Sequence, residues 1–103
     1  MSTFVFAYRT PQGYAGSADT AAAWNAWFEN LDAQLMEHGN PVVGRQSLGN
    51  CGTDTLLGGY TLISAEDLAS AVALARGCPI LAAGGGVEVG ELAPVNAERR
   101  AAA

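Results

Sequence analysis

The sequence contains no lysine and few charged residues of any kind. Of its 103 residues, 15% are charged, with ten carboxylates against five arginines and a formal net charge of −5. A chain of this charge has little with which to neutralise a phosphate backbone, which argues against nucleic acid as a partner. Half of the residues are apolar, so the composition is that of a globular protein rather than a disordered one.

Cysteine is scarce and long apolar runs are absent. Cys51 and Cys78 have no metal-type spacing and no signal peptide is recognised before them, so we expect free thiols in the reducing cytoplasm. The apolar stretches are far shorter than the ~20 residues that cross a bilayer, so we expect no membrane association. The sequence also lacks a Gly-x-Ser-x-Gly motif and a metal-type cluster of His, Cys and carboxylates. We therefore expect no cofactor.

Hydrophobic periodicity predicts four strands and two helices. Alternating or β-branched runs place the strands at residues 3–9, 42–48, 59–63 and 87–92. The first helix is predicted to begin at Asp19 and to end at Gly39, and the second to begin at Ser64 and to end at Gly77. Helical spacing puts one apolar stripe on the first helix, made of Trp24, Trp27, Phe28, Leu31 and Leu35.

This order, βαββαβ, predicts an α+β, ferredoxin-like domain. Both helices should cover one face of a four-stranded antiparallel sheet. We expect this domain to occupy residues 1–95 and a frayed tail to follow at residues 96–103. The other face of the sheet would expose more apolar surface than a small monomer tolerates, so we expect a homodimer formed through the sheet, or a bound ligand.

Several segments resemble the YCII-related family, particularly its DGPF-type branch. They are Leu57-Gly-Gly-Tyr-Thr-Leu-Ile63, Cys78-Pro79 and Gly85-Gly86-Val-Glu-Val89 in the second half, with Phe6-Ala-Tyr-Arg9 and the helix at residues 24–35 in the first. The resemblance implies the dimeric α/β-barrel version of the ferredoxin-like fold. It agrees with the element order derived above, which does not depend on it.

The chain departs from the family pattern at two places. Residues 49–57 are shorter than the family's usual hairpin and lack the Asp-Gly-Pro-Phe signature, of which Asp54 is the one residue in common. The family's proposed catalytic pair is a histidine on the first helix with an acidic residue nearby, and that histidine position falls near Phe28. The sole histidine here is His38, at the end of the predicted helix, so the pair is not carried over and no catalytic residue is assigned.

His38 and the aromatic residues are candidates for a binding site. His38 could act as an acid or base near neutral pH, or it could simply interact with exposed carbonyls in the last turn of the helix. Trp24 and Trp27 could form a wall for a planar ligand, although the spacing of Trp27 is that of a core residue. Tyr8 and Tyr60 could add hydroxyl groups to such a site.

Two arginines are the other candidates. Arg9 is predicted at the end of the first strand and Arg45 within the second, where a guanidinium in an apolar sheet must find an anionic partner. Glu88 or Glu91 could supply it inside the protein. Alternatively, the arginines could clamp an anionic small molecule.

Three functions are compatible with these features. The first is a dimer that binds a small anionic or aromatic compound through Arg9, Arg45, Trp24, Tyr60 and His38. The second is a non-catalytic dimerisation or interaction module. The third is a cofactor-independent enzyme of the lyase or oxygenase kind, which the fold alone does not establish.

Overall fold

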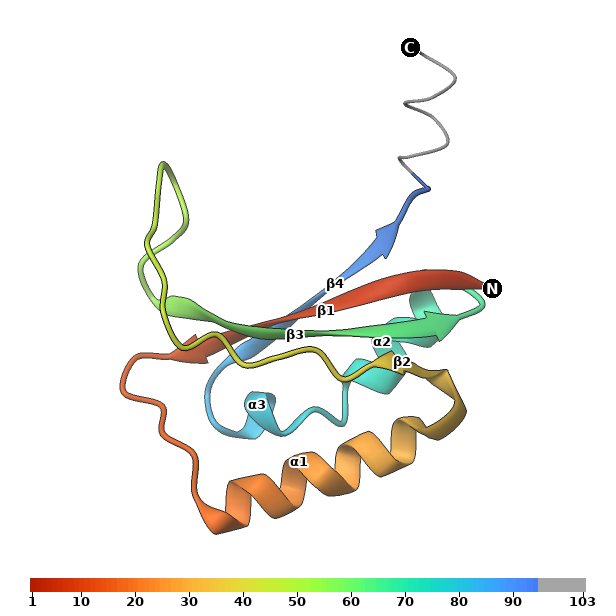
Figure 1. The fold of residues 1–103 in the computed structure, drawn as a ribbon, viewed down its shortest axis with the longest axis horizontal. Helices are drawn as coiled ribbons and strands as arrows, with labels where there is room; N and C mark the ends of the chain where they lie inside the picture. The colour runs from red at the N-terminus through yellow and green to blue at the C-terminus, as the bar shows by residue number, and fades with distance from the viewer. Residues whose placement is uncertain (95–103) are drawn as a thin grey trace.

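The computed structural model describes residues 1–94, and its elements follow the order predicted from the sequence (Figure 1). The strands are Ser2–Pro11 (β1), Leu35–Glu37 (β2), Thr55–Ala65 (β3) and Gly86–Leu92 (β4). The helices are Ala18–Leu31 (α1), Leu68–Ala75 (α2) and Pro79–Ala82 (α3), with a 3-10 turn at Asp32–Gln34 (η1). The tail predicted at residues 96–103 lies outside the described residues.

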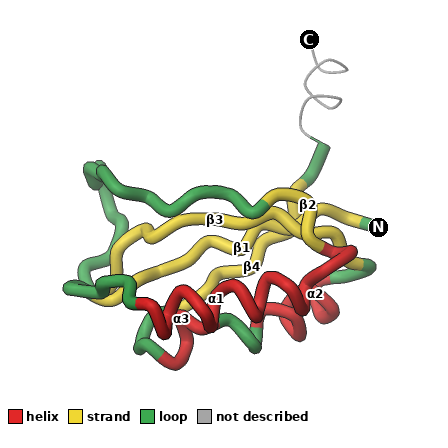
Figure 2. Tube along the Cα trace, turned by 60° about the horizontal axis from the view of Figure 1, so that its bottom comes forward, coloured by secondary structure: helices red, strands yellow, loops and turns green. Residues whose placement is uncertain are grey.

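The four strands form one antiparallel sheet in the order β2-β3-β1-β4. The helices lie together on one side of this sheet (Figure 2). This arrangement confirms the α+β, ferredoxin-like fold predicted from the element order. Within residues 1–94, no helix combines the length and the apolar character that a membrane span requires.

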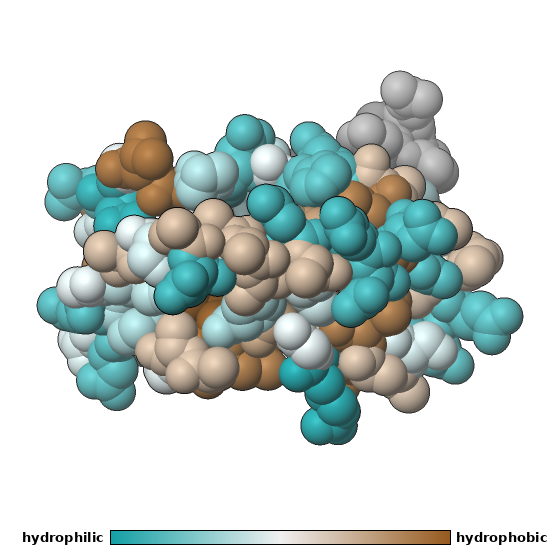
Figure 3. Space-filling view, turned by 90° about the horizontal axis from the view of Figure 1, so that it is seen from below, coloured by the Kyte–Doolittle hydropathy of each residue, from teal (hydrophilic) through white to brown (hydrophobic). Residues whose placement is uncertain are grey.

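The core lies between the sheet and the helices. Along β1 the side chains alternate, so Phe4, Phe6 and Tyr8 are buried on the helix side. Helix α1 contributes Trp27 and Leu31 to this core. The Trp27 ring stacks on that of Phe6, with 5.8 Å between the ring centroids. Seen from the side on which α1 lies, the surface mixes hydrophilic residues with hydrophobic ones (Figure 3). The buried residues of α1 are Trp27 and Leu31, which are directed inward.

The predicted second strand at residues 42–48 is wrong. Helix α1 ends at Leu31 because Asp32 adopts a left-handed conformation with φ +44°, and η1 then turns the chain back toward β3. As a result Leu35 belongs to β2 rather than to the helical stripe, and His38 follows this strand instead of closing a helix. Arg45 accordingly lies in the long loop between β2 and β3.

Both predicted helix starts are also wrong by a few residues. Ser17, not Asp19, caps α1: its hydroxyl accepts a hydrogen bond from the Thr20 amide, and the Thr20 hydroxyl accepts one from the Ser17 amide. Asp67 caps α2 by accepting from the Ser70 backbone amide at 2.8 Å. Hydrogen bonding with the side chain of Ser70, and secondly with this amide, lowers the pKa of Asp67. Ser64 is unavailable as a cap because β3 continues to Ala65.

Residues 38–42, called the edge segment below, prolong the edge of the sheet beyond β2. The Val42 amide donates to the Gly58 carbonyl at 3.0 Å, and Pro41 bridges to Gly59. Gly39 makes this close approach possible: its φ is +73°, and a Cβ at this position would overlap the carbonyl oxygen of Tyr60. The segment is therefore held against β3 by its backbone.

Replacing Gly39 with alanine should detach the edge segment. Gly49 offers a matched control, because its φ is +71° but a Cβ there would meet nothing within 4 Å. We expect Gly49→Ala to lower the free energy of unfolding by about 1 kcal/mol, the cost of a left-handed alanine, and Gly39→Ala to lower it by at least ~1 kcal/mol more. Urea unfolding measures both. Equal losses in the two variants would contradict the close approach at Gly39.

Candidate ligand-binding cleft

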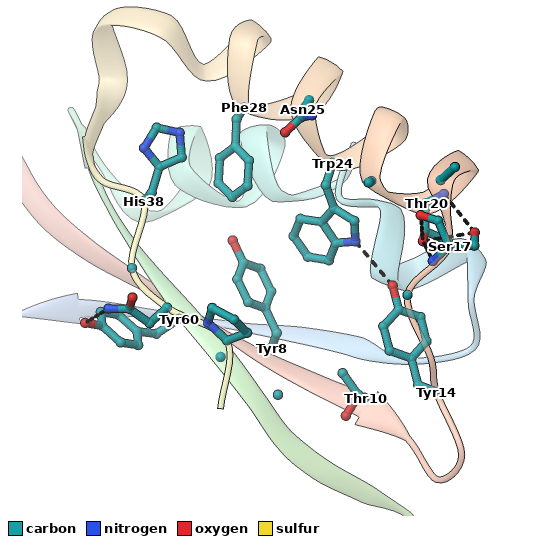
Figure 4. Close-up of a pocket in the computed structure, with 18 residues that line it drawn as sticks. Tyr8, Thr10, Tyr14, Ser17, Thr20, Trp24, Asn25, Phe28, His38 and Tyr60 are labelled. Atoms are coloured by element: carbon teal, nitrogen blue, oxygen red, sulfur yellow. Dashed lines mark hydrogen bonds between the residues drawn. The ribbon is translucent and has the colours of Figure 1, made fainter. Parts of the chain in front are cut away.

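A cleft of about 920 Å³ lies between α1, the end of β1 and the edge segment (Figure 4). Helix α1 and the loop before it form one wall, and the edge segment with β3 forms the other. The lining residues are Tyr8, Thr10, Tyr14, Gly16, Ser17, Ala18, Thr20, Ala21, Trp24, Asn25, Phe28, His38, Gly39, Asn40, Pro41, Gly58, Gly59 and Tyr60. The cleft is thus lined largely by aromatic and small residues.

A chain of two hydrogen bonds crosses the floor of the cleft. The Tyr8 hydroxyl donates to Oγ1 of Thr61 at 2.6 Å, and Thr61 donates in turn to the His38 carbonyl at 2.8 Å. Thr61 is fully buried and Tyr8 is 6% exposed. Burial raises the pKa of Tyr8, an effect that the bond to Thr61 only partly opposes. The Tyr8 hydroxyl therefore stays protonated at neutral pH and remains a hydrogen-bond donor.

Aromatic rings of α1 form the wall that faces this floor. Trp24 and Tyr8 pack edge to face, with 4.9 Å between ring centroids and an interplanar angle of 82°. Phe28 lies one turn further along the helix, 5.9 Å from Trp24. The Trp24 indole also donates to the Tyr14 hydroxyl at 3.3 Å, which ties the loop before α1 to the helix. The wall is consequently a continuous aromatic surface.

His38 lies at the end of the cleft opposite Tyr14 (Figure 4). Its ring is 4.8 Å from that of Phe28 and inclined to it by 56°. The side chain is exposed, so it borders the opening rather than the floor. An imidazole thus contacts the helix position at which the family resemblance expects a histidine, although it comes from the opposite wall.

Arg9 and Arg45, the two arginines predicted to bind a ligand, lie outside the cleft. Arg9 donates to the carbonyls of Thr55 at 3.0 Å and Cys51 at 3.3 Å. Arg45 donates to the carbonyls of Leu57 and Val42 at 3.0 and 2.9 Å. Both guanidinium groups bond to main-chain oxygens and hold the loop between β2 and β3 against the sheet.

The structure brings three of the five predicted site residues, Trp24, Tyr60 and His38, to the cleft. Tyr60 lies at the margin of the cleft. It pairs with Ala7, which is on the sheet face opposite Tyr8, so the Tyr60 ring lies on that opposite face too. There its hydroxyl accepts a hydrogen bond from the side-chain Nδ2 of Asn40 at 3.4 Å.

Sequence reasoning missed Thr61 and Tyr14. The signal for Thr61 was its place on the inward side of an alternating strand, where a polar residue needs a partner. No comparable signal marks Tyr14, which lies in a loop.

The described residues offer no group of three or more His, Cys, Asp or Glu side chains that could hold a metal ion. Both cysteines are free, with Cys51 exposed and Cys78 buried in the core. Burial raises the pKa of Cys78 to about 11, so its thiol is protonated and unreactive at neutral pH. The chemistry available in the cleft is that of aromatic rings, hydroxyl groups, the side-chain amides of Asn25 and Asn40, and one imidazole.

Comparisons with known proteins agree with this fold. The model of the YCII-related domain matches residues 1–96. Among solved structures, the chain is similar to 5-chloro-2-hydroxyhydroquinone dehydrochlorinase (TftG) from Burkholderia phenoliruptrix AC1100, in complex with 2,5-dihydroxybenzoquinone. The two share 25% sequence identity with a TM-score of 0.58, over 88% of this chain and 93% of that one. A search of curated protein sequences finds no significant match.

The hydrogen-bond chain on the floor can be tested by a double-mutant cycle. Thr61→Val leaves the buried Tyr8 hydroxyl without its acceptor, so we expect the free energy of unfolding to fall by about 2 kcal/mol. Tyr8→Phe alone should cost about 1 kcal/mol. Because the double variant removes both partners, its loss should be smaller than the sum of the single losses by about 1 kcal/mol. Additive losses in urea unfolding would show that the two hydroxyls are not coupled.

Proposed function

The chain belongs to the YCII-related family, and from the aromatic cleft along α1 we propose that it binds a small, planar ring compound there. The observation that carries the proposal is the continuous surface of Tyr8, Trp24 and Phe28 facing an open cleft. A flat ring that stacks on this surface would displace water from its apolar and aromatic atoms, which favours binding. Cavities of roughly 300–1,000 Å³ with few polar groups are typical small-molecule sites.

The similar structure supports a ring-shaped ligand. TftG was solved with 2,5-dihydroxybenzoquinone, a planar six-membered ring with oxygen substituents. The hydroxyl of Tyr14 and the imidazole of His38 are polar groups of this cleft that could meet such oxygens. The same compound is therefore a reasonable first probe for this chain.

The cleft favours an aromatic ligand over a simple anion. None of the residues that line it is an arginine, lysine, aspartate or glutamate. The guanidinium groups of Arg9 and Arg45, which could have clamped an anion, already bond to carbonyl oxygens elsewhere. Ring stacking and hydrogen bonds should thus supply more of the affinity than charge pairing.

Two alanines on α1 provide a test with a matched control. Ala21 lines the cleft, whereas Ala22 is not part of the lining, and both side chains are exposed. Ala21→Glu should therefore obstruct the cleft, and Ala22→Glu should make the same change of charge without obstructing it. Titration with 2,5-dihydroxybenzoquinone, followed by calorimetry, should give at least tenfold weaker binding for Ala21→Glu and unchanged binding for Ala22→Glu.

Two results would contradict the proposal. One is the absence of binding to the wild-type protein by this compound and by a panel of phenols and naphthols. The other is equal binding by the two glutamate variants, which would place the ligand elsewhere.

We further propose that the protein forms a homodimer through the face of the sheet that the helices leave uncovered. Val5 and Leu62 are paired on this face, each between buried residues that point the other way. The exposed Met36 and Leu92 extend the apolar surface. Apolar surface of this kind on a small protein commonly marks an interface.

The oligomeric state tests this second proposal. Leu62→Glu places a charge in the middle of the uncovered face, and Leu81→Glu makes the same change on α3, where the leucine is 44% exposed. By light scattering after gel filtration, the wild-type protein and Leu81→Glu should have twice the 10.5 kDa mass of one chain. Leu62→Glu, with folding checked by circular dichroism, should have the mass of a monomer. A monomeric wild-type protein would refute the dimer.

Two finer assignments rest on sequence features. We propose that the chain belongs to the DGPF-type branch of the family, on the residues Cys78-Pro79 and Gly85-Gly86-Val-Glu-Val89. We propose a cytoplasmic location on the basis of the two free cysteines, since a reducing compartment keeps thiols unpaired.

A further inference from the structure

We propose that His38 makes the cleft selective for ring compounds that carry an acidic hydroxyl group, by pairing its imidazolium with the ionised hydroxyl. This inference deepens the proposed function and rests on it. It identifies the residue that distinguishes such ligands from other flat rings of the same size. Phenols and hydroxyquinones made acidic by electron-withdrawing substituents form the corresponding chemical class.

His38 is the one residue of the described lining whose side chain can take a positive charge near neutral pH. The other ionisable lining groups are the hydroxyls of Tyr8, Tyr14 and Tyr60. Burial raises the pKa of Tyr8, so this hydroxyl on the floor of the cleft is neutral at neutral pH.

The position of His38 is fixed while its nitrogens stay available. Thr61 anchors its carbonyl at 2.8 Å, and its ring packs against Phe28. Within residues 1–94, neither nitrogen of the imidazole makes a hydrogen bond to the protein. Because the ring borders the opening of the cleft, a ligand that stacks along α1 can present a substituent to it (Figure 4).

The elements around His38 supply no competing carboxylate on the cleft side. From α1, the ring packs against Phe28, and Glu29 is not among the residues that line the cleft. From the strand preceding it, Glu37 pairs with Leu62, so its side chain lies on the outer face of the sheet. An anionic oxygen on a ligand would thus meet the imidazolium without displacing an internal ion pair.

The proton balance of binding follows from this pairing. When a neutral hydroxyl ligand meets a neutral imidazole, the hydroxyl proton moves to the ring nitrogen, and the pair forms with no proton exchanged with solvent. When the ligand is already ionised, the imidazole takes one proton from solvent on binding. Affinity for an ionised ligand should therefore be higher when the imidazole is protonated than when it is neutral.

A pair of ring compounds tests the inference. The first, 2,5-dihydroxybenzoquinone, is ionised in this pH range, and the second, its dimethyl ether, has the same ring but no acidic hydroxyl. Calorimetric titrations at pH 5.5 and 8.5 would use the wild-type protein and the variant His38→Phe, which retains a ring against Phe28. The dimethyl ether controls for stacking in each case, and Ala22→Glu controls for a change in overall charge.

We expect the wild-type protein to prefer the hydroxyl compound by about tenfold at pH 5.5, which is the strength of a charge-assisted hydrogen bond at a partly exposed site. This preference should be largely lost at pH 8.5, and His38→Phe should lack it at both values. If both compounds bind but the preference persists in His38→Phe, or does not change with pH, the role of His38 is refuted while the cleft remains the binding site. If neither compound binds, the proposed function fails and this inference with it.

Discussion

The hydroxyl of Thr61 is the contact on which the arrangement of the cleft depends. It is fully buried, accepts from Tyr8 on β1 and donates to the main chain at His38, so one side chain connects the floor to the edge segment. Without it, the edge segment would retain its contacts with Gly58, Gly59, Tyr60 and Arg45 but lose its bond to the floor. The same hydroxyl accepts the hydrogen bond of the buried Tyr8 hydroxyl. Without this acceptor, burying the Tyr8 donor would cost free energy of folding.

The two walls that this hydrogen-bond chain joins differ in composition. The wall on α1 is aromatic and held by the core, since Trp24 and Phe28 lie next to the buried Trp27. The opposite wall is made of glycine and proline together with the polar residues His38, Asn40 and Tyr60. A flat ring would thus find its stacking surface on one side and its polar contacts on the other. Such a division of roles suits recognition of a substituted ring better than recognition of a bare anion.

The fold was predictable because its largest signals are local. Alternation in β1, the stripe of Trp24 and Trp27, and the Val87–Glu91 pattern each reflect burial on one face, and the structure confirms their elements. The second strand was misplaced because three residues are too few to show a period, and because a left-handed Asp32 leaves no clear mark in the sequence. The edge segment and the pairing of Arg45 with carbonyls depend on tertiary contacts, which no local pattern encodes.

A crystal structure of the protein grown with 2,5-dihydroxybenzoquinone would test the central claim most directly. The account predicts one ring lying along Trp24 and Phe28, with an oxygen substituent within hydrogen-bonding distance of the His38 imidazole. A ring bound on the outer face of the sheet, or a cleft filled only by water at a saturating concentration of the compound, would contradict it.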